Sequence, residues 1–296
     1  MEKDIIISID VGGTTFESSI LNKNCLDIIA ISEKWHVGDY STSQELFDAI
    51  NSQINDLLNI KTIDKKRVFG LSVACPGPID INSGTILDTP NLKLFRNYPL
   101  KDKLAEKFTC KICIENDANL FALGEWFLTH QKHSSFIGVT IGTGLGFGIV
   151  IDGKLFKGAN GMAAEYGLSS CEWGTWEDKV SLKFIRNDIK KTYNKNLSPR
   201  TIQKYASDKD IKAQNIFNRL GQNLGLPISH IINMLDPGVI VLGGGLSSAF
   251  NLYKKELKQT IHNNSVVYKN NPCTILESNF KSKSQMVGGA LNLIQP

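Results

Sequence analysis

Apolar and polar positions form the same pattern in two separate stretches of the chain. IIISIDVGGTTFESSILN (5–22) has the pattern of a strand, a glycine-containing turn and a second strand. The pattern returns in FIGVTIGTGLGFGIVIDGKLF (136–156), where Asp152-Gly153 predicts a tight turn into a short third strand. Other apolar runs predict further strands, namely RVFGLSVAC (67–75), CKICIE (110–115) and GVIVLGGG (238–245).

Apolar residues spaced three and four positions apart predict amphipathic helices between these strands. The longest such pattern covers residues 210–235, and Pro227 predicts a kink within it. LSSAFNLYKKEL, which follows the strand at 238–245, predicts another helix. Each half of the chain therefore opens with a glycine-tipped hairpin and continues with strands and helices, which is typical of an α/β protein. The other helical patterns lie at 43–59, 100–108, 118–130 and 178–193.

The length and composition are those of an ordinary globular protein. The chain has 296 residues, enough for one large or two medium domains, with 42% hydrophobic and 21% charged residues. Its formal net charge of +4 is small for this length and indicates neither a nucleic-acid nor a membrane partner. We interpret the short basic runs, Lys65-Lys66-Arg67 and Lys190-Lys191, as solvated surface.

Nothing in the sequence pattern indicates export or insertion into a membrane. No apolar run reaches the roughly 18 residues that a membrane-spanning helix needs. The N-terminal stretch MEKDIIISID lacks the basic and apolar regions of a secretory signal. The six cysteines are scattered through mostly apolar contexts, as the reduced thiols of cytosolic proteins are. We therefore expect a cytoplasmic protein.

Two glycine-rich turns offer backbone N–H groups to an anion, because no side chain blocks the approach. A tight hairpin without a ligand is the alternative interpretation for either turn taken alone. Neither turn fits a P-loop, and the second also fails G-x-G-x-x-G, because Phe147 stands where the third glycine would fall. The first turn contains Asp10, Gly12, Gly13, Thr14 and Thr15, and the second contains Gly142, Thr143 and Gly144.

A third glycine cluster, Gly243-Gly244-Gly245, ends the predicted strand at 238–245. Bare backbone at the end of a parallel strand suits the flat face of an adenine or ribose, since a side chain would collide with it. Two turns for phosphates and this cluster for a nucleoside together favour an ATP site over three unrelated turns. A cleft between the two halves is where such a ligand is expected.

Polar side chains directly follow one of the predicted buried strands. Glu115, Asn116 and Asp117 open the stretch ENDANLFALGE (115–125), after the apolar run at 112–114. A carboxylate within hydrogen-bond reach of a hydroxyl can accept its proton while a phosphoryl group is transferred. Taken alone, Asp117 is better explained as the N-cap of the following helix.

These stretches, in this order, resemble the actin/hexokinase ATPase superfold and, more closely, the ROK family (repressor, open reading frame, kinase) of bacterial sugar kinases. The resemblance covers nearly the whole chain, and Phe147 replaces a glycine that is usual in the family. The similar motifs are IDVGGTT (9–15), SVACPGPID (72–80), TPNL (89–92), ENDANLFALGE (115–125), GTGLGFG (142–148) and LDPGVIVLGGGLS (235–247).

The resemblance implies two actin-like ATPase (ribonuclease H-like) α/β domains with a cleft between them. The first would cover residues 1–118 and be completed by a C-terminal helix at about 284–296. The second would cover residues 119–283. A homodimer is also expected from the resemblance.

The resemblance also assigns roles to individual residues. Asp117 would be the general base and Asn116 a sugar-binding amide, while Asp10 would orient Mg²⁺ through water. Carboxylates and amides suit the paired hydroxyls of a sugar, so Asn91, Glu165 and Glu177 are further candidates for sugar contacts. The expected ATP contacts are Asp10, Gly12, Gly13, Thr14, Thr15, Gly142, Thr143, Gly144, Gly243, Gly244 and Gly245.

The segment AAEYGLSSCEWGTWEDKVS (163–181) departs from the family pattern. Leu168 replaces the family's histidine, and only Cys171 remains of its cluster of zinc-binding cysteines. A structural zinc needs four nitrogen or sulfur ligands, so we expect no structural zinc here. Trp173 and Trp176 are expected to hold the segment by packing, unless they are simply two aromatic residues of a surface loop.

The sequence therefore predicts an ATP-dependent hexose kinase that phosphorylates the 6-hydroxyl of a sugar, most simply glucose. N-acetylmannosamine and fructose are the alternative substrates in the same family. A sugar-binding protein without turnover stays open because of the altered segment 163–181. A transcription regulator of the family is not expected, since such proteins carry a helix-turn-helix domain first and the predicted hairpin starts at residue 4.

Overall fold

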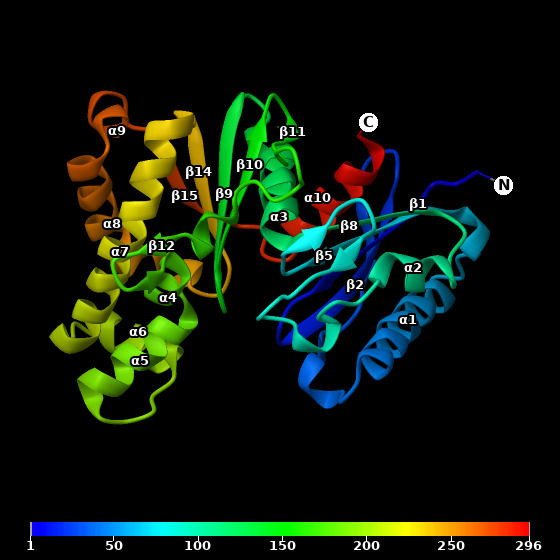
Figure 1. The fold of residues 1–296 in the computed structure, drawn as a ribbon, viewed down its shortest axis with the longest axis horizontal. Helices are drawn as coiled ribbons and strands as arrows, with labels where there is room; N and C mark the ends of the chain where they lie inside the picture. The colour runs from blue at the N-terminus through cyan, green and yellow to red at the C-terminus, as the bar shows by residue number, and fades with distance from the viewer. Residues whose placement is uncertain (1, 296) are drawn as a thin grey trace. The chain divides into compact units, whose positions relative to one another are not determined.

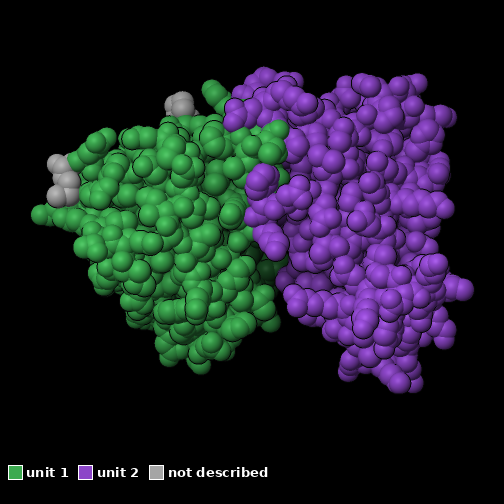
Figure 2. Space-filling model, turned by 180° about the vertical axis from the view of Figure 1, so that it is seen from behind, with its two compact units in different colours: residues 1–129, 153–163, 282–296 green, residues 130–152, 164–281 purple. Residues whose placement is uncertain are grey.

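The glycine-tipped hairpin predicted at residues 5–22 lies in the first of two units into which the chain divides (Figures 1 and 2). The computed structural model describes residues 2–295. Unit 1 consists of residues 1–129, 153–163 and 282–296, and unit 2 of residues 130–152 and 164–281. Each unit has its own mixed sheet and its own hydrophobic core.

The sheet of unit 1 has the order β3-β2-β1-β5-β8, with β4 paired to β2. The first hairpin, β1 and β2, is antiparallel, whereas β1, β5 and β8 run parallel. The strands are β1 (Ile5–Val11), β2 (Thr15–Asn22), β3 (Ile28–Ile31), β4 (Trp35–His36), β5 (Val68–Cys75), β6 (Ile79–Asp80), β7 (Thr85–Ile86), β8 (Lys111–Asn116) and β11 (Lys154–Leu155). The helices are α1 (Ser43–Ile60), α2 (Leu100–Ala105), α3 (Asp117–Glu125) and α10 (Lys283–Ile294), with 3-10 turns η1 (Val37–Asp39), η2 (Lys65–Arg67) and η3 (Lys93–Phe95).

Side-chain alternation along β1 explains why helices cover both faces of this sheet. Ile5, Ile7 and Ile9 share one core with the apolar face of α1. On the other face, α10 packs against β1 and β5, and a Cβ at Gly289 would lie 2.7 Å from the hydroxyls of Ser8 and Ser72. Helix α10 therefore covers the face of the sheet opposite α1 (Figure 1).

The limits of unit 1 differ from the expected domain, 1–118 with a helix at about 284–296. Helix α3 stays with unit 1 because it packs against α10. Residues 153–163 also belong to unit 1, where Lys157 bonds to residues of β8 and α10. Long-range contacts of this kind leave no periodic signal in the sequence.

The sheet of unit 2 contains the strand order β10-β9-β14-β15. Strands β9 and β10 form the second hairpin, whereas β9, β14 and β15 run parallel. The strands are β9 (Ser135–Ile141), β10 (Leu145–Ile151), β12 (Ser170–Cys171), β13 (Gly174–Thr175), β14 (Val239–Gly243) and β15 (Thr274–Glu277). The helices are α4 (Trp176–Val180), α5 (Leu182–Tyr193), α6 (Pro199–Ser207), α7 (Ile211–Leu235), α8 (Phe250–Asn264) and α9 (Val266–Asn270), with 3-10 turns η5 (Glu165–Leu168) and η6 (Ser247–Ala249).

Helices α7 and α8 pack against each other and share a core with one face of the β9–β10 hairpin. The long helix predicted at 210–235 is confirmed, and Pro227 lies inside it without ending it. The helix predicted at 178–193 is instead two helices, α4 and α5, separated by Ser181 in extended conformation. The helix predicted at 118–130 is α3 followed by a π-helical turn, Trp126–His130. Within residues 2–295, no helix combines the length and apolar character of a membrane span.

Candidate active site

Three parallel strands of unit 1 end side by side, and they carry the polar residues that the sequence indicated. Asp10, near the end of β1, pairs in register with Ala74 of β5, which in turn pairs with Glu115 of β8. Asp117 comes directly after β8 and is the first residue of α3. Because the carboxyl ends of parallel strands lie at one edge of a sheet, Asp10 and Asp117 share that edge.

Burial raises the pKa of both carboxyl groups. Desolvation raises the pKa of Asp10 to about 7, with the charges of Asp117 and Glu17 acting in the same direction and Lys34 in the opposite one. Burial raises the pKa of Asp117 as well, against the lowering effect of its hydrogen bond from the Ala118 amide, which is 2.8 Å long. A carboxyl group with a raised pKa is suited to accepting a proton near neutral pH.

Asn116, not Asp117, caps the N-terminus of α3. Its backbone is extended, and its Oδ1 accepts hydrogen bonds from the amides of Ala118 (2.9 Å) and Asn119 (3.4 Å). The alternative interpretation of Asp117 as the N-cap is therefore wrong, because Asp117 already lies within the helix. With the cap supplied by its neighbour, the Asp117 carboxylate is not needed to start α3.

Glu115 is a structural residue of the site that the sequence reasoning did not assign. Its side chain is 2% exposed, and its Oε1 accepts from the Asn116 amide (3.0 Å) and from Asn119 Nδ2 (3.0 Å). Its Oε2 pairs with Lys157 Nζ at 2.9 Å, and the same ammonium donates to Asn292 Oδ1 of α10. This network fixes the start of α3, and thereby the position of Asp117. The sequence signal that could have identified Glu115 is its position as an acidic residue at the end of a predicted buried strand.

The first glycine turn lies against another predicted site residue. The Gly12 amide donates to the Thr15 carbonyl (2.9 Å) and closes the turn between β1 and β2. A Cβ at Gly13 would collide with the backbone carbonyl of Asn91, so only glycine fits there. The Val37 amide holds the turn from another side, donating to the Thr14 carbonyl. The fold therefore brings the first turn and Asn91 together within unit 1.

The second and third glycine clusters are neighbours in unit 2. The Gly142 amide donates to the Gly144 carbonyl (2.9 Å), which closes the turn between β9 and β10. Gly244 has a φ of +83°, and a Cβ there would lie 2.5 Å from the carbonyl oxygen of Ile141, the residue before this turn. By contrast, a Cβ at Gly142 or Gly245 would meet no described heavy atom within 4 Å. Bare backbone is thus exposed on both clusters, as a nucleotide site requires.

The segment 163–181 is bound to the second turn. Glu177 Oε2, on α4, accepts a hydrogen bond from the Leu145 amide (3.1 Å), and the Leu182 amide donates to the Gly142 carbonyl (2.8 Å). A Cβ at Gly167 would collide with the Leu145 carbonyl, so η5 also lies against this strand. Glu165, the first residue of η5, and Glu177 therefore sit on a segment whose position is tied to the Gly142 turn.

An aromatic cluster holds the segment that departs from the ROK pattern. Tyr166 Oη and His230 Nδ1 of α7 are 2.7 Å apart, and the Trp176 ring packs edge-on to the His230 ring. Trp176 is 8% exposed and belongs to the core, so its predicted anchoring role is confirmed. The same prediction for Trp173 is wrong, because this side chain is 75% exposed at the tip of the β12–β13 hairpin.

The carboxyl group of Asp10 suits a magnesium ion that arrives bound to the nucleotide. Residues 2–295 contain no cluster of three or more His, Cys, Asp or Glu side chains that could hold a metal. Mg²⁺ takes few protein carboxylates and keeps water and phosphate oxygens as its other ligands. Asp10 is a buried carboxyl group whose raised pKa a nearby cation would offset, and it lies beside the first glycine turn.

The sequence model of the ROK family matches residues 6–295. The chain belongs to the ROK family. Its structure is similar to a ROK glucokinase from Streptomyces griseus, solved with glucose and AMPPNP, with a TM-score of 0.83, 25% identity, and 97% and 98% of the two chains covered. The two units therefore have the actin-like ATPase fold of ROK sugar kinases.

The curated relatives of this ROK chain include both enzymes and regulators. A glucokinase from Halalkalibacterium halodurans is 28% identical over 283 residues, which are 86% of this chain and 84% of that protein. A xylose repressor from Caldicellulosiruptor bescii is 29% identical over 247 residues, which are 75% of this chain and 62% of the repressor. Membership of the ROK family therefore supports a sugar kinase, and the residues of the site must distinguish it from a regulator.

Proposed function

We propose that this ROK chain is an ATP-dependent hexose kinase that transfers the γ-phosphoryl group to the 6-hydroxyl of a sugar, with glucose as the first candidate. The observation that carries the proposal is Asp117, a half-buried carboxyl group with a raised pKa at the edge shared with Asp10. A protein that only binds sugar has no need of a base there.

In the proposed reaction, the Asp117 carboxylate accepts the proton of the sugar hydroxyl. The hydroxyl oxygen forms a bond to the γ-phosphorus while the bond between that phosphorus and the bridging oxygen of ADP breaks. The products are the sugar phosphate and ADP, and the proton passes from Asp117 to solvent. The Glu115–Lys157 pair and the Asn116 cap hold Asp117 in place during the transfer.

We propose that the residues named from the sequence bind the sugar and the nucleotide. Asn91, Asn116 and Asp117 of unit 1, with Glu165 and Glu177 of unit 2, would contact the sugar. Exposed backbone at the glycine clusters would bind the nucleotide, with Thr14, Thr15 and Thr143 meeting phosphate oxygens. Asp10 would hold Mg²⁺ through water, and this ion supplies positive charge that neutralises the phosphates when bound. The remaining proposed ATP contacts are Gly12, Gly13, Gly142, Gly144, Gly243, Gly244 and Gly245.

Other sugars of the same class are the alternatives to glucose. N-acetylmannosamine and fructose were expected as alternatives, and a curated relative from Histophilus somni is an N-acetyl-D-glucosamine kinase that is 29% identical over 271 residues. Leu168 stands where the family has a histidine. Glu165 and Leu168 would determine which of these sugars is accepted. The free thiols fit the proposed cytoplasmic location, and sedimentation velocity would test the proposed homodimer.

The proposal is tested by coupled ADP release across a panel of hexoses and N-acetylhexosamines at fixed Mg²⁺-ATP. We expect turnover with at least one sugar, together with ³¹P resonances of a 6-phosphate product. A chain that binds a sugar in calorimetry but releases no ADP above the ATP-only background would be a sugar sensor or a regulator instead. That outcome would overturn the kinase proposal.

A further inference from the structure

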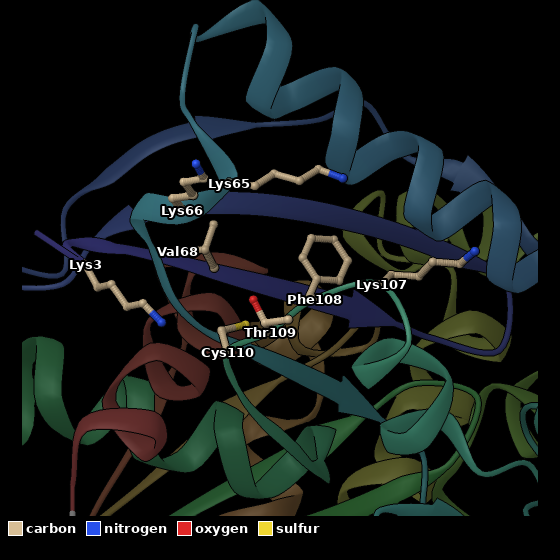
Figure 3. A pocket seen from close by; sticks show the side chains of 8 residues that line it. All are labelled: Lys3, Lys65, Lys66, Val68, Lys107, Phe108, Thr109 and Cys110. Carbon is tan, nitrogen blue, oxygen red and sulfur yellow. The ribbon is translucent and has the colours of Figure 1, made fainter. Parts of the chain in front are cut away.

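A small pocket with an apolar floor and a cationic rim lies in unit 1, away from the residues of the candidate site. The pocket has a volume of about 290 Å³. Its floor is formed by the buried side chains of Val68 and Phe108 with the half-buried Cys110. Its rim consists of Lys3, Lys65, Lys66 and Lys107, with Thr109 adding a hydroxyl (Figure 3).

The lysines reach this pocket from three separate parts of the chain. Lys3 precedes β1, Lys65 and Lys66 form the turn before β5, and Lys107 lies between α2 and β8. Figure 3 shows Phe108 beside the Lys65 side chain, Val68 next to Lys66, and Cys110 on the side of Lys3, whereas Lys107 extends away from them. Lys65 Nζ lies 5.2 Å from the centroid of the Phe108 ring.

None of these ammonium groups has an anionic partner within residues 2–295. Two nearby acidic side chains are already engaged: Asp4 pairs with Arg67 at 2.6 Å, and Asp64 accepts from the Lys66 amide at 2.9 Å. The chain's whole formal charge is only +4, so four unpaired lysines around one pocket are a marked local concentration. Such a concentration attracts an anion.

The position of the pocket separates it from the candidate active site. Its residues precede or begin β1, β5 and β8, whereas Asp10 and Asp117 lie at the opposite ends of these strands. Strand β8 has six residues, and at roughly 3.3 Å each its two ends are on the order of 20 Å apart. A ligand in this pocket would therefore not compete with one at Asp117.

We propose that this pocket binds a small organic phosphate, held by Lys3, Lys65 and Lys66 through its charge and by the floor through its carbon skeleton. A phosphate dianion takes several ammonium donors at once. The volume admits a three- to six-carbon phosphate but is at the lower limit of ligand pockets, below the size that a nucleotide needs. The sequence predicts Lys65-Lys66 as solvated surface, and both residues are exposed. The fold places Lys3 and Phe108, which are distant in sequence, in the same pocket.

The test is calorimetric titration of the full chain with 3-phosphoglycerate. Glycerate, which keeps the carboxylate but lacks the phosphate group, is the control ligand. We expect saturable binding of the phosphate compound alone. The double variant Lys65→Ala/Lys66→Ala should weaken this binding by about tenfold or more, since it removes two of the charges that contact the ligand. Binding should also weaken as salt concentration rises.

Two matched controls make the result specific to this pocket. Lys190→Ala/Lys191→Ala removes a similar exposed pair from α5 in unit 2 and should leave the affinity unchanged. Asp117→Asn should leave it unchanged as well, whether or not the chain proves to be a kinase. The inference is overturned if the wild type shows no saturable binding at millimolar ligand. It is also overturned if the two lysine pairs affect binding equally, or if the Lys65/Lys66 variant binds with the affinity of the wild type.

Discussion

At the scale of single residues, the carboxyl groups at the ends of β1 and β8 determine what the site can do. Asp10 and Asp117 both have raised pKa values because they are desolvated, and at Asp10 nearby negative charges add to this effect. Such groups are stabilised by a cation or by a proton, and they oppose folding when they are ionised alone. A cation that arrives with a substrate would therefore stabilise these carboxylates. Without it, the free energy of unfolding should depend on pH.

Because the pKa of Asp10 is raised to about 7, this group should make the free energy of unfolding smaller at neutral pH than at acidic pH. Between its unfolded pKa of about 4 and its folded value, Asp10 binds more proton when folded, so the free energy of unfolding falls as pH rises through this window. Asp10→Asn should remove that decline, with an effect on the order of a few kcal/mol.

Urea denaturation at pH 5 and pH 7.5, without nucleotide or Mg²⁺, measures this difference. Asp27→Asn is the matched control, because Asp27 is exposed and lies in a turn of the same unit. A pH dependence that is as steep in Asp10→Asn as in the wild type would mean that another group is responsible.

Gly13 is the residue of the first turn that tolerates least change. Its missing side chain leaves room for the Asn91 carbonyl, so Gly13→Ala must displace either the turn or the Asn91 segment. We expect a loss of at least about 1–3 kcal/mol in stability, since overpacking costs that much, and a clear rise in KM for ATP. Gly38→Ala is the control, because a Cβ at Gly38 meets no described atom within 4 Å. Equal behaviour of the two variants would contradict this account.

At the scale of elements, the segment 163–181 is held by packing and hydrogen bonds. Tyr166, Trp176 and His230 form one cluster, and Glu177 and Leu182 tie the segment to the second turn. The same ties explain why the predicted helix at 178–193 is broken. Ser181 must be extended so that the Leu182 amide can reach the Gly142 carbonyl.

We expect alanine substitution of the two tryptophans of this segment to have different effects on the free energy of unfolding. Trp176→Ala should lower the free energy of unfolding by about 3–5 kcal/mol, because it leaves a cavity in the core of unit 2. Trp173→Ala should change it by less than about 0.5 kcal/mol, because this side chain is exposed. Chemical denaturation of the two variants checks both values. Similar losses would show that Trp173 is buried by a contact outside this chain.

The segment is also predicted to need no structural zinc. Residues 160–182 contain one cysteine and no histidine, and His230 binds Tyr166. Treatment with a strong chelator, followed by return of Mg²⁺, should leave the melting temperature and the activity unchanged. Metal analysis should find zinc well below one equivalent per chain. A melting temperature that falls on chelation and recovers only with zinc would show that the segment binds metal after all.

The predictable elements are those whose signal is local. The hairpin at 5–22, the helix at 43–59 and the strand at 67–75 were predicted within about two residues, because their periodicity and turn residues are contiguous. Helix α6 was missed, although Ser198 followed by Pro199 is an N-terminal signal. The Glu115–Lys157 pair and the contact of His230 with Tyr166 lay beyond prediction, because each joins residues distant in sequence.

At the scale of the whole molecule, each unit contains part of the residue set proposed from the sequence. Unit 1 contains Asp10, Asn91 and Asp117, and unit 2 contains the second turn and the third glycine cluster. Membership of the ROK family establishes the fold and supports a sugar kinase. We propose that the choice of sugar depends on side chains around Glu165. A regulator and a kinase of this fold differ in whether a base acts on the bound sugar.

The most direct test is therefore the turnover of Asp117→Asn with the sugar that the wild type prefers. The amide keeps the size of the side chain but cannot accept a proton, so kcat should fall by at least about 10²-fold. The melting temperature and the calorimetric affinity for the sugar should stay close to those of the wild type, which would separate catalysis from folding and binding. Near wild-type turnover in this variant would contradict the role of Asp117 and, with it, the proposed mechanism.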